Sequence, residues 1–371
     1  MKRIGVLTSS RSDYGILLPL LQGMQDDADI ELKLIVFGTH LSYTHGYTIN
    51  QIEGDGFRVK FKVYSLVMGD TQESVASAIG LTQIKFASFW AEHKHEFDMV
   101  VCIGDRYEMF GAVSAGIPFN MVFAHIHAGE ITLGAIDNIF RHAISHASTI
   151  HFTSTEFYAE RVRAMIDSPI EVHNVGALSL DSLAKMKLFT VSEFLGKWKI
   201  DLTKRPSVLI TFHPETLSIG NNEAYANILA EVVLDLTRQY QAIITMPNAD
   251  SEGDMIRMVL TRKLSGHEHV SLVENFGTKG YFTAMKYARF LVGNTSSGII
   301  EAASFNKYVI NIGNRQNGRI CSTNVMNVPI DHKAILGAIE KVEALGDFTG
   351  ENLYWNGGAS ALIKNVLKKY N

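Results

Sequence analysis

Residues 289–305, RFLVGNTSSGIIEAASF, join a short apolar run to a small polar loop and then to an apolar segment with helical spacing. Apolar runs rich in Val, Ile and Phe recur along the chain, for example RIGVL, DMVVCIG and SVLITF. Longer stretches with helical spacing, such as YGILLPLLQGM, lie between most of these runs. Apolar strands that alternate with amphipathic helices are typical of parallel sheets with helices on both faces. The sequence therefore predicts an α/β fold.

The length of the chain and a break in this rhythm indicate two domains. The chain has 371 residues, which is more than one hydrophobic core usually serves. The segment DSLAKMKLFTVSEFLGKW is predicted to be a helical linker, and a new strand begins near Ser207. We predict two Rossmann-like domains, residues 1–178 and 202–350, that face a cleft, and a C-terminal helix, 357–371, that packs back on the first domain. Ligands of open α/β sheets bind at the carboxyl ends of strands, so the site is expected in that cleft.

The composition is that of a soluble globular protein. Hydrophobic residues make up 46% of the chain and charged residues 19%, and the formal net charge is −4. This charge predicts no general attraction to nucleic acid or to an anionic membrane. No apolar run reaches the roughly 18 residues that a membrane helix requires, and the first one is too short for a signal peptide. Cys102 and Cys321 have neither disulfide nor zinc-site spacing. A cytoplasmic enzyme is the expectation.

The loop inside the opening stretch is the most specific local signal for a ligand. Hydroxyl groups and backbone N–H groups at a helix N-terminus bind phosphate well, and Thr295, Ser296 and Ser297 supply both. Simple helix capping is the alternative interpretation. Glu301 lies one turn further on, where a carboxylate suits ribose hydroxyls better than phosphate. Arg315 follows the next predicted strand, near the same edge of the sheet.

The loop after the first predicted strand, TSSRSDYG, carries a second signal for an anion. Arg11 precedes a helix N-terminus, where the dipole and the guanidinium favour a negative group. An ordinary capped helix with a solvated arginine is the alternative. The dinucleotide fingerprint G-x-G-x-x-G and the Walker lysine motif are both absent, which argues against a nicotinamide enzyme and against nucleotide hydrolysis of the Walker type.

Three further predicted strands end in residues that can carry chemistry. Asp105 and Arg106 follow DMVVCIG and are either catalytic groups or a structural ion pair. His213 follows SVLITF and is suited to phosphate binding or proton transfer, although a structural histidine is equally common. Asn248 follows QAIITM, where it can bind a sugar or base or simply form a turn.

The stretch HIHAGEITLGAIDN has two interpretations. As a strand end followed by a loop, it supplies the proton-transfer groups His127, Glu130 and Asp137 to the cleft. As a metal site, its histidines would combine with those of RHAISHASTIH, two of which lie one helical turn apart. The HExxH signature is absent, and paired histidines on helices are usually structural. We therefore expect proton-transfer groups and no metal.

Taken in order, the motifs resemble those of one family. TSSRSDYG, IGDR, HIHAGE, GAIDN followed by RHAI, FHPET, GNTSSGIIE and GNRQNGR resemble the hydrolysing UDP-N-acetylglucosamine 2-epimerases of bacterial sialic acid and related pathways. The resemblance extends from Ile4 to about Cys321. It implies a glycosyltransferase-B-like fold and conversion of UDP-N-acetylglucosamine and water to N-acetylmannosamine and UDP. It also implies a UDP-sugar ligand, no metal or redox cofactor, and a homodimer or homotetramer.

The resemblance implies roles for the same strand-end residues. It implies diphosphate or sugar contacts for Arg11 and His213, and a ribose contact for Glu301. It implies proton handling, or support for it, by Asp105 and Asp137. The other substrate contacts that it implies are Thr295, Ser296 and Ser297 at the diphosphate, and His40, Arg106, Asn248 and Arg315 at further positions in the cleft.

The chain departs from the family pattern at His127, because members often carry a catalytic glutamate at that position. The proton-transfer role then belongs to His127 or to another of the candidate acids and bases, which are Asp105, Glu130, Asp137 and His213. The departure also leaves UDP-N,N'-diacetylbacillosamine, or a GDP-linked counterpart, as an alternative substrate. A non-hydrolysing 2-epimerase, a glycosyltransferase of the same architecture and a non-catalytic sugar-nucleotide-binding protein are the rival functions.

Overall fold

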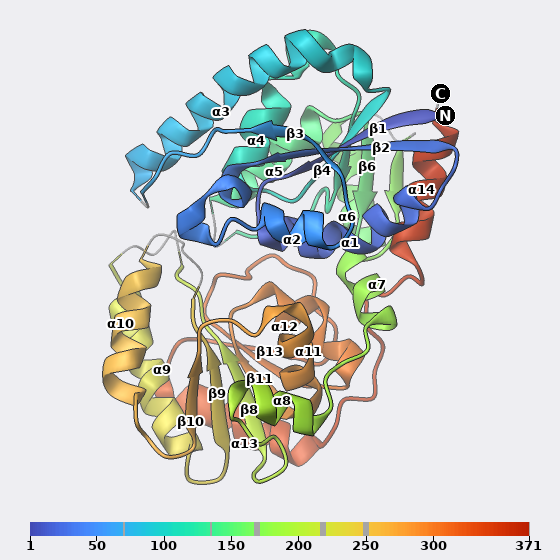
Figure 1. Ribbon diagram of the computed structural model, residues 1–371. Coiled ribbons are helices and arrows are strands. Elements are labelled where there is room, and N and C mark those ends of the chain that lie inside the picture. Colours follow the sequence, from blue (N-terminus) through green and yellow to red (C-terminus); the bar gives the residue numbers. More distant parts are fainter. Residues whose placement is uncertain (70, 134–135, 167–170, 216–219, 248–251, 371) are drawn as a thin grey trace. The chain divides into compact units, whose positions relative to one another are not determined.

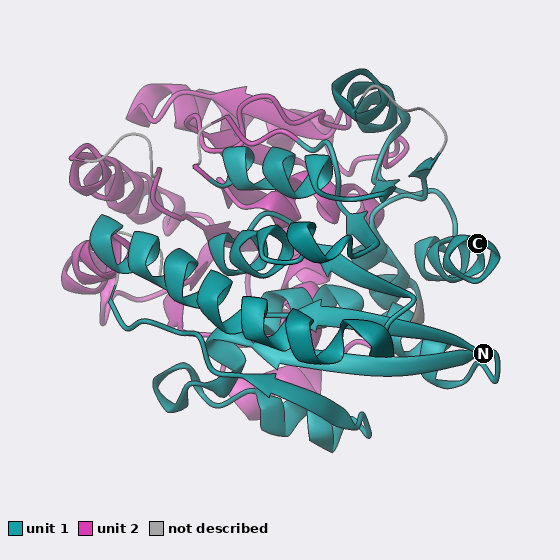
Figure 2. Cartoon of the chain, turned by 90° about the horizontal axis from the view of Figure 1, so that it is seen from above, with its two compact units in different colours: residues 1–130, 137–184, 354–371 teal, residues 131–136, 185–353 magenta. Residues whose placement is uncertain are grey.

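The computed structural model describes residues 1–69, 71–133, 136–166, 171–215, 220–247 and 252–370. Figure 1 shows their helices and strands. The chain divides into two compact units, which are coloured separately in Figure 2. Unit 1 consists of residues 1–130, 137–184 and 354–371, and unit 2 consists of residues 131–136 and 185–353.

Unit 1 contains a parallel sheet with strand order β3-β2-β1-β4-β5-β6-β7. The order reverses between β1 and β4, and such switch points are where open α/β sheets bind ligands. Its strands are β1 (Lys2–Thr8), β2 (Ile30–Phe37), β3 (Val59–Val63), β4 (Met99–Ile103), β5 (Phe123–Ile126), β6 (Ile150–Thr153) and β7 (Val172–Asn174).

Helices cover both faces of this sheet (Figure 1). One group packs together on one face, with α3 against α4 and α4 against α5, while α1 packs against α14. Four short turns of 3-10 helix also lie in the connections of the described residues, namely η1 (Gly38–Leu41), η2 (Tyr43–His45), η3 (Lys94–Glu96) and η4 (Ile117–Phe119). The helices are α1 (Arg11–Gln25), α2 (Ile49–Gly54), α3 (Gln72–His93), α4 (Tyr107–Ser114), α5 (Asp137–His146), α6 (Glu156–Ile166), α7 (Leu178–Lys185) and α14 (Ala359–Lys369).

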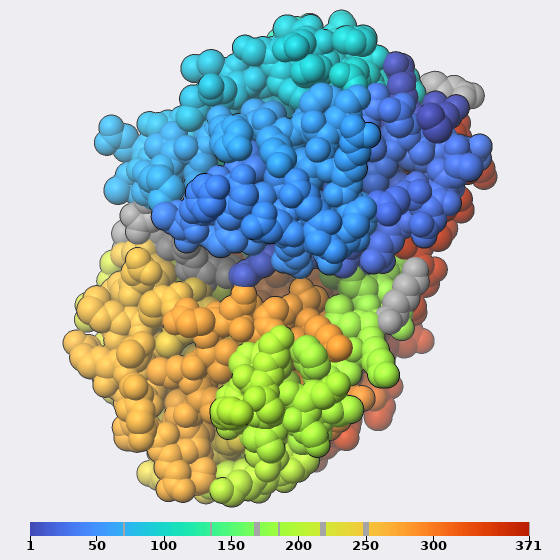
Figure 3. All heavy atoms as spheres, viewed as in Figure 1, coloured from blue at the N-terminus to red at the C-terminus, as the bar shows by residue number. Residues whose placement is uncertain are grey.

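The C-terminal helix α14 belongs to unit 1 because a buried carboxylate caps it. Asp181 accepts hydrogen bonds from the backbone N–H groups of Ala359 and Ser360, at 3.0 and 2.7 Å. At the other end of the helix, Lys368 forms an ion pair with Asp27 at 2.8 Å. Figure 3 accordingly shows the red C-terminal residues bordering the blue N-terminal ones.

Unit 2 repeats the same topology with strand order β10-β9-β8-β11-β12-β13, all parallel, and its switch point lies between β8 and β11. Its strands are β8 (Ser207–Thr211), β9 (Gln241–Thr245), β10 (Val270–Val273), β11 (Ala288–Gly293), β12 (Val309–Ile312) and β13 (Val325–Val328). Its helices are α8 (Val191–Trp198), α9 (Asn222–Leu236), α10 (Gly253–Leu264), α11 (Gly277–Tyr287), α12 (Ser296–Ile300), the 3-10 turn η5 (Ala302–Phe305) and α13 (His332–Leu345).

The burial of the strands explains why apolar runs in the sequence predicted them. Every residue of β4 and of β8 is buried, as expected for central strands of a sheet that helices cover on both sides. The apolar runs singled out in the sequence coincide with strands of the two sheets. The predicted fold class, α/β with two Rossmann-like sheets, is confirmed. Within the described residues, no helix is both long and apolar enough to cross a membrane.

The structure places the unit boundaries differently from the expected ranges. The segment expected to be a linker is divided between the units, since α7 lies largely in unit 1 whereas α8 lies in unit 2. In unit 2 the ring of Phe194 packs against that of Phe276, with the ring centroids 5.3 Å apart. Residues 131–136 also belong to unit 2. There the Leu133 N–H group donates to the Asn317 carbonyl at 2.9 Å. Because the described groups of α8 and of residues 131–136 contact other residues of unit 2, both segments belong to that unit.

Candidate active site

The switch point of unit 2 depends on a glycine. Gly293, the last residue of β11, has φ +145°, and a Cβ atom there would lie 1.9 Å from the Thr211 carbonyl oxygen of β8. No side chain fits in that space, so only glycine allows the ends of these two strands to approach so closely. The approach brings together the loops that follow β8 and β11, which carry His213 and Thr295.

Asn294 joins three strand-end loops of unit 2. Its side chain accepts a hydrogen bond from the His213 N–H group at 2.7 Å and donates one to the His213 carbonyl at 2.8 Å. Its own carbonyl accepts from Gln316 Nε2 at 2.8 Å and from Arg315 Nη1 at 3.2 Å. The sequence analysis did not identify Asn294, although its place between Gly293 and a capping threonine was a usable signal.

Thr295 caps the helix that opens the predicted phosphate loop. Its Oγ1 accepts from the Ser297 N–H group at 3.3 Å, which makes Ser296 the first residue of α12. Glu301 is buried at the C-cap of the same short helix. Capping and phosphate binding are compatible, because one threonine oxygen satisfies only one of the free N–H groups.

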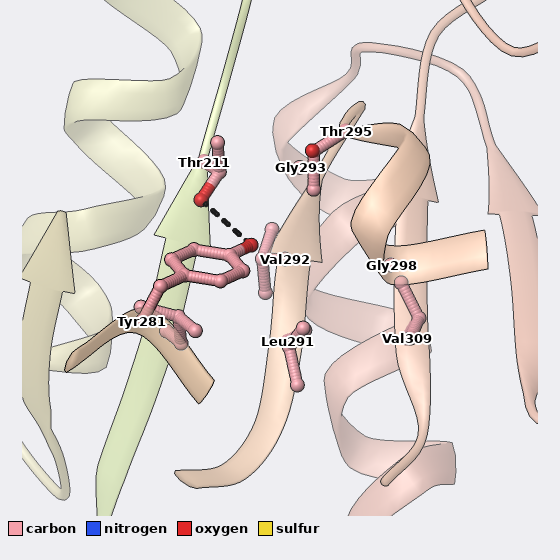
Figure 4. Close-up of a pocket in the computed structure, with 9 residues that line it drawn as sticks. Thr211, Tyr281, Leu291, Val292, Gly293, Thr295, Gly298 and Val309 are labelled. Atoms are coloured by element: carbon pink, nitrogen blue, oxygen red, sulfur yellow. Dashed lines mark hydrogen bonds between the residues drawn. The ribbon is translucent and has the colours of Figure 1, made fainter. Parts of the chain in front are cut away.

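A narrow gap between side chains, too small to admit a water molecule, lies beneath this loop (Figure 4). Its lining includes Thr211, Tyr281, Thr295 and Gly298, and the Tyr281 hydroxyl lies 3.3 Å from Thr211 Oγ1. Burial raises the pKa of the Tyr281 phenol, so this group keeps its proton and can donate a hydrogen bond.

His213 is held as a neutral imidazole. Burial, with a further contribution from the positive charge of Arg315, lowers the pKa of His213 to about 3. Near neutral pH the ring therefore adds no positive charge of its own, and Arg315 supplies the charge at this edge of the sheet.

Glu215 fixes the loop that carries Arg315. Its Oε1 accepts from the Asn314 N–H group at 2.5 Å, and its own N–H group donates to Asn222 Oδ1 at 2.9 Å. Gly313 allows this contact, since it has φ +78° and a Cβ atom there would lie 2.3 Å from Glu215 Oε1. The glutamate of FHPET is thus a buried brace between the loops that follow β8 and β12.

Arg141 plays the corresponding part in unit 1. It is buried in α5 and forms an ion pair with Asp105, which follows β4. Its Nη1 donates to the His127 carbonyl at 3.1 Å and to Glu130 Oε2 at 3.4 Å, both after β5. The arginine of RHAI was quoted as part of a motif but was not assigned a role. The structure shows that it joins three of the predicted proton-transfer residues.

His127 and Glu130 form a buried pair. His127 Nδ1 lies 2.5 Å from Glu130 Oε1, and Ser154 Oγ donates to the same oxygen at 2.7 Å. His127 has φ +63°, in the left-handed region that non-glycine residues seldom adopt. The predicted interpretation of this stretch as a strand end followed by polar groups agrees with these contacts.

Asp105 and Arg106 do not pair with each other. Asp105 pairs with Arg141, whereas Arg106 makes two hydrogen bonds to Glu108, at 3.1 and 2.9 Å. Asp13 is a nearby buried carboxyl that the sequence analysis did not assign. It accepts from the Ser9 hydroxyl at 2.6 Å, and burial raises its pKa.

The remaining candidates differ in their surroundings. Arg11 is exposed at the first position of α1, and Asp137 is partly exposed at the first position of α5. His40 is fully buried, with Nε2 2.9 Å from Thr8 Oγ1 and Nδ1 2.7 Å from Thr48 Oγ1. Both ring nitrogens of His40 therefore have partners inside unit 1. Asn248 lies outside the described residues.

Two of the histidines considered as metal ligands, His125 and His151, make structural hydrogen bonds. His125 Nδ1 lies 3.0 Å from Ser145 Oγ and its Nε2 2.8 Å from the Gly104 carbonyl, while His151 Nε2 lies 2.8 Å from the Ser145 carbonyl. Among the residues that the structure describes, no three His, Cys, Asp or Glu side chains are grouped to hold a metal ion. These contacts tie β5 to the loop that follows β4, and both β5 and β6 to α5.

The buried neutral histidines predict a steep loss of stability in acid. Burial lowers the pKa of His40 to about 4 and those of His125 and His213 to about 3, well below the ordinary 6.5. The unfolded chain therefore binds more protons as the pH falls below 6.5, and each histidine removes about 1.4 kcal/mol of stability per pH unit down to its folded pKa. Urea unfolding at pH 7, 6 and 5 measures this slope. The His125→Gln variant should reduce the slope of unfolding free energy against pH, and the exposed His45→Gln variant should keep it. An unfolding free energy that does not change between pH 7 and pH 5 in the wild-type protein would contradict the expectation.

Comparison with known proteins places these features in a family. The profile of the UDP-N-acetylglucosamine 2-epimerases matches residues 22–368. The GDP/UDP-N,N'-diacetylbacillosamine 2-epimerase (hydrolyzing) of Campylobacter jejuni is 33% identical over 344 residues, which are 92% of this chain and 88% of that protein. The UDP-N-acetylglucosamine 2-epimerase of Neisseria meningitidis is 30% identical over 359 residues, covering 96% and 92%. In structure, the Neisseria meningitidis UDP-GlcNAc 2-epimerase bound to UDP-GlcNAc matches with a TM-score of 0.84, at 18% identity over 100% of both chains. This likeness shows a glycosyltransferase-B-like fold.

Proposed function

Because the chain belongs to the UDP-N-acetylglucosamine 2-epimerase family, we propose that it is a hydrolysing 2-epimerase that converts UDP-N-acetylglucosamine and water to N-acetylmannosamine and UDP. The observation that carries this proposal is the cluster of ionisable side chains at the strand ends of unit 1, where Arg141 joins Asp105, His127 and Glu130. A protein that only bound a sugar nucleotide would not need several proton-transfer groups at one edge of a sheet.

The chemistry explains why such groups are required. The C2 proton of an N-acetylhexosamine is weakly acidic, because no adjacent carbonyl delocalises a carbanion. Its removal becomes feasible when the diphosphate leaves C1 at the same time and a glycal forms. One group must take the C2 proton, another must return a proton to the opposite face, and water must add at C1. Each well-placed proton-transfer group contributes roughly 10²–10⁴-fold in rate, and Asp105, His127, Glu130, Asp137 and His213 are the candidates.

The loops of unit 2 supply what the leaving diphosphate needs. Charge grows on the diphosphate as the C1–O bond breaks, and fixed donors stabilise that charge best. Asn294 holds the His213 backbone and the Arg315 side chain in place, and the N-terminus of α12 presents backbone N–H groups. We propose that Thr295, Ser296, Ser297 and Arg315 bind the diphosphate and that Glu301 binds the ribose.

A second substrate is favoured by one specific observation. The Campylobacter jejuni relative, at 33% identity, is named for UDP- or GDP-linked N,N'-diacetylbacillosamine. That sugar differs from N-acetylglucosamine at C4 and C6, so the reaction at C1 and C2 is the same. We therefore propose a hydrolysing 2-epimerase for a nucleotide-linked 2-acetamido sugar, with UDP-N-acetylglucosamine as the first candidate.

Incubation of the protein with each UDP-sugar in heavy water tests this function. We expect free UDP, and a released sugar of manno configuration that carries deuterium at C2. A non-hydrolysing epimerase would exchange the C2 hydrogen but return a UDP-sugar, and a glycosyltransferase would leave the C2 hydrogen in place. A binding protein would leave the donor intact. Turnover without solvent deuterium at C2 would rule out the elimination route.

A further inference from the structure

We propose that His127 is the general base that takes the C2 proton, and that Glu130 is the positioning residue that fixes the tautomer of its ring. The inference rests on the proposed function and narrows its candidates, since it gives two of the four proton-transfer residues of unit 1 different tasks. Glu130 then acts through His127 and does not itself touch the reacting carbon.

The described contacts of Glu130 make it an acceptor toward His127. Its Oε1 accepts from Ser154 Oγ at 2.7 Å, and its Oε2 accepts from Arg141 Nη1 at 3.4 Å. An ionised carboxylate that already receives these two donors acts toward the imidazole as an acceptor as well. At a separation of 2.5 Å, the ring hydrogen of a neutral His127 therefore lies on Nδ1. The lone pair of the ring then lies on Nε2, where a base needs it.

The other ring nitrogen of His127, Nε2, is free to accept a proton. This atom is buried, and no residue that the structure describes forms a hydrogen bond with it. Buried polar atoms almost always have partners, and His40 and His125 have them at both ring nitrogens. His151 also has one buried ring nitrogen, Nδ1, without a partner among the described residues, but its Nε2 is held by a backbone carbonyl, whereas Nδ1 of His127 is held by a carboxylate. A buried imidazole that a carboxylate holds at one nitrogen, with the other nitrogen without a protein partner, has the arrangement of a base that awaits a substrate proton.

The backbone of His127 is held in a strained conformation by the same network. Its φ of +63° is disfavoured for a residue with a Cβ atom. Such conformations persist where the surroundings impose them, and they cluster at functional sites. Here the His127 carbonyl accepts from Arg141 Nη1 at 3.1 Å, so Arg141 holds both the backbone of the base and the carboxylate that orients it.

The proposed step balances as follows. Nε2 of His127 accepts the proton from C2, and the electrons of that C–H bond form the C1–C2 double bond. The electrons of the C1–O bond leave with UDP, and the glycal is formed. Glu130 stabilises the resulting imidazolium at Nδ1, as buried carboxylates do for catalytic histidines. A second acid then protonates C2 and water adds at C1, for which Asp105 and Asp137 are the candidates.

Glu130→Gln is the main test, because it keeps the size of the side chain and removes the charge. We expect kcat to fall by about 10²–10⁴-fold, with KM changed less than about threefold. Glu171→Gln is the matched control, since Glu171 forms an equivalent but partly exposed pair with His173 at 3.1 Å, and it should keep the wild-type kcat. UDP binding by the Glu130→Gln variant confirms that it is folded.

The pH profile separates positioning from a purely structural role. Removal of the carboxylate charge next to the base should displace the acidic limb of kcat/KM, whereas a purely structural change should leave that limb in place. The other charged or titratable groups around the pair are Arg141, Asp105, His125 and His142, and they are unchanged in this variant. An unchanged limb with a full kcat would overturn the assignment.

A readout without turnover keeps the inference falsifiable if the variants fold poorly. In wild-type protein with ¹⁵N-labelled histidine, the neutral His127 ring should carry its hydrogen on Nδ1, with the signal assigned by its loss in His127→Gln. A hydrogen on Nε2 would overturn the inference. Wild-type protein that released no UDP from either sugar would instead overturn the proposed function, and the base assignment with it. Wild-type turnover combined with a fully active Glu130→Gln variant would overturn the inference alone.

Discussion

Gly293→Ala should destabilise unit 2 by about 3–5 kcal/mol. This figure is the sum of two costs, the strain of a disfavoured φ angle and the overpacking of a core that has no free space. The added methyl carbon would lie 1.9 Å from the oxygen and 2.7 Å from the carbon of the Thr211 carbonyl group. Both are backbone atoms of the neighbouring strand, so no side chain can move aside to make room. Urea unfolding of the full chain measures the loss, read from the transition of unit 2 where the units unfold separately.

Substitutions at two other glycines separate the contribution of backbone strain from that of steric overlap. Gly266 has φ +77° but no atom within 4 Å of its hypothetical Cβ, so Gly266→Ala should show the backbone strain alone, about 1–2 kcal/mol. Gly337 lies in α13 with open space around it and should gain stability on change to Ala, by about 0.5–1 kcal/mol. If Gly293→Ala were no less stable than Gly266→Ala, the contact with Thr211 would not matter.

The same substitution should weaken nucleotide binding. Asn294 and Thr295 directly follow Gly293, and His213 is the second residue after β8, so pushing the two strands apart displaces the proposed diphosphate loops. We expect the Kd for UDP, measured by calorimetry on the folded fraction, to rise at least about tenfold, which corresponds to about 1.4 kcal/mol. An unchanged Kd in a destabilised variant would show that these loops do not bind the diphosphate.

Arg141→Met should have the largest effect in unit 1. The guanidinium is buried and joins Asp105, Glu130 and the His127 carbonyl. Methionine fills a similar volume but leaves carboxylates without their counter-charge, and breaking a buried ion pair in this way costs about 3–5 kcal/mol. UDP release should fall by at least about 10²-fold, because the base and its neighbours lose their fixed geometry.

A second, charged replacement distinguishes lost charge from lost packing at this position. Arg141→Lys should restore part of the stability but not the activity, since an ammonium group cannot form the same fork of hydrogen bonds.

Arg163 offers a matched control for this experiment. It pairs with Glu156 at 2.6 Å in the next helix, but both side chains are substantially exposed. Exposed pairs contribute about 0–1 kcal/mol, so Arg163→Met should keep nearly full stability and activity. Equal thermal unfolding of the two methionine variants would contradict the role that we assign to Arg141.

Much of the candidate site was predictable because strand ends are readable in the sequence. Asp105, His127, His213 and Thr295 each follow an apolar run, and each lies just beyond the carboxyl end of a strand in the structure. Local rules were sufficient here, because the end of a buried strand and the cap of a helix are properties of a few consecutive residues.

The partners of these residues were not predictable in the same way. The sequence analysis considered an ion pair between Asp105 and Arg106, but Asp105 pairs with Arg141, which is 36 positions away. Neither Asn294 nor Glu215 was predicted to hold the loops of unit 2, because their partners are 81 and 99 positions away along the chain.

The sequence by itself determined the α/β class, the strands and the chemical nature of the groups at their ends. This was possible because strands that are buried on both faces of a parallel sheet consist of continuous apolar runs, which are recognisable in the sequence. Only the tertiary structure decided which strand ends are neighbours, that residues 131–136 belong to unit 2, and that His127 keeps one ring nitrogen without a described partner. The physical reason is that these features depend on strand order and on contacts between distant segments, which no local pattern of residues encodes.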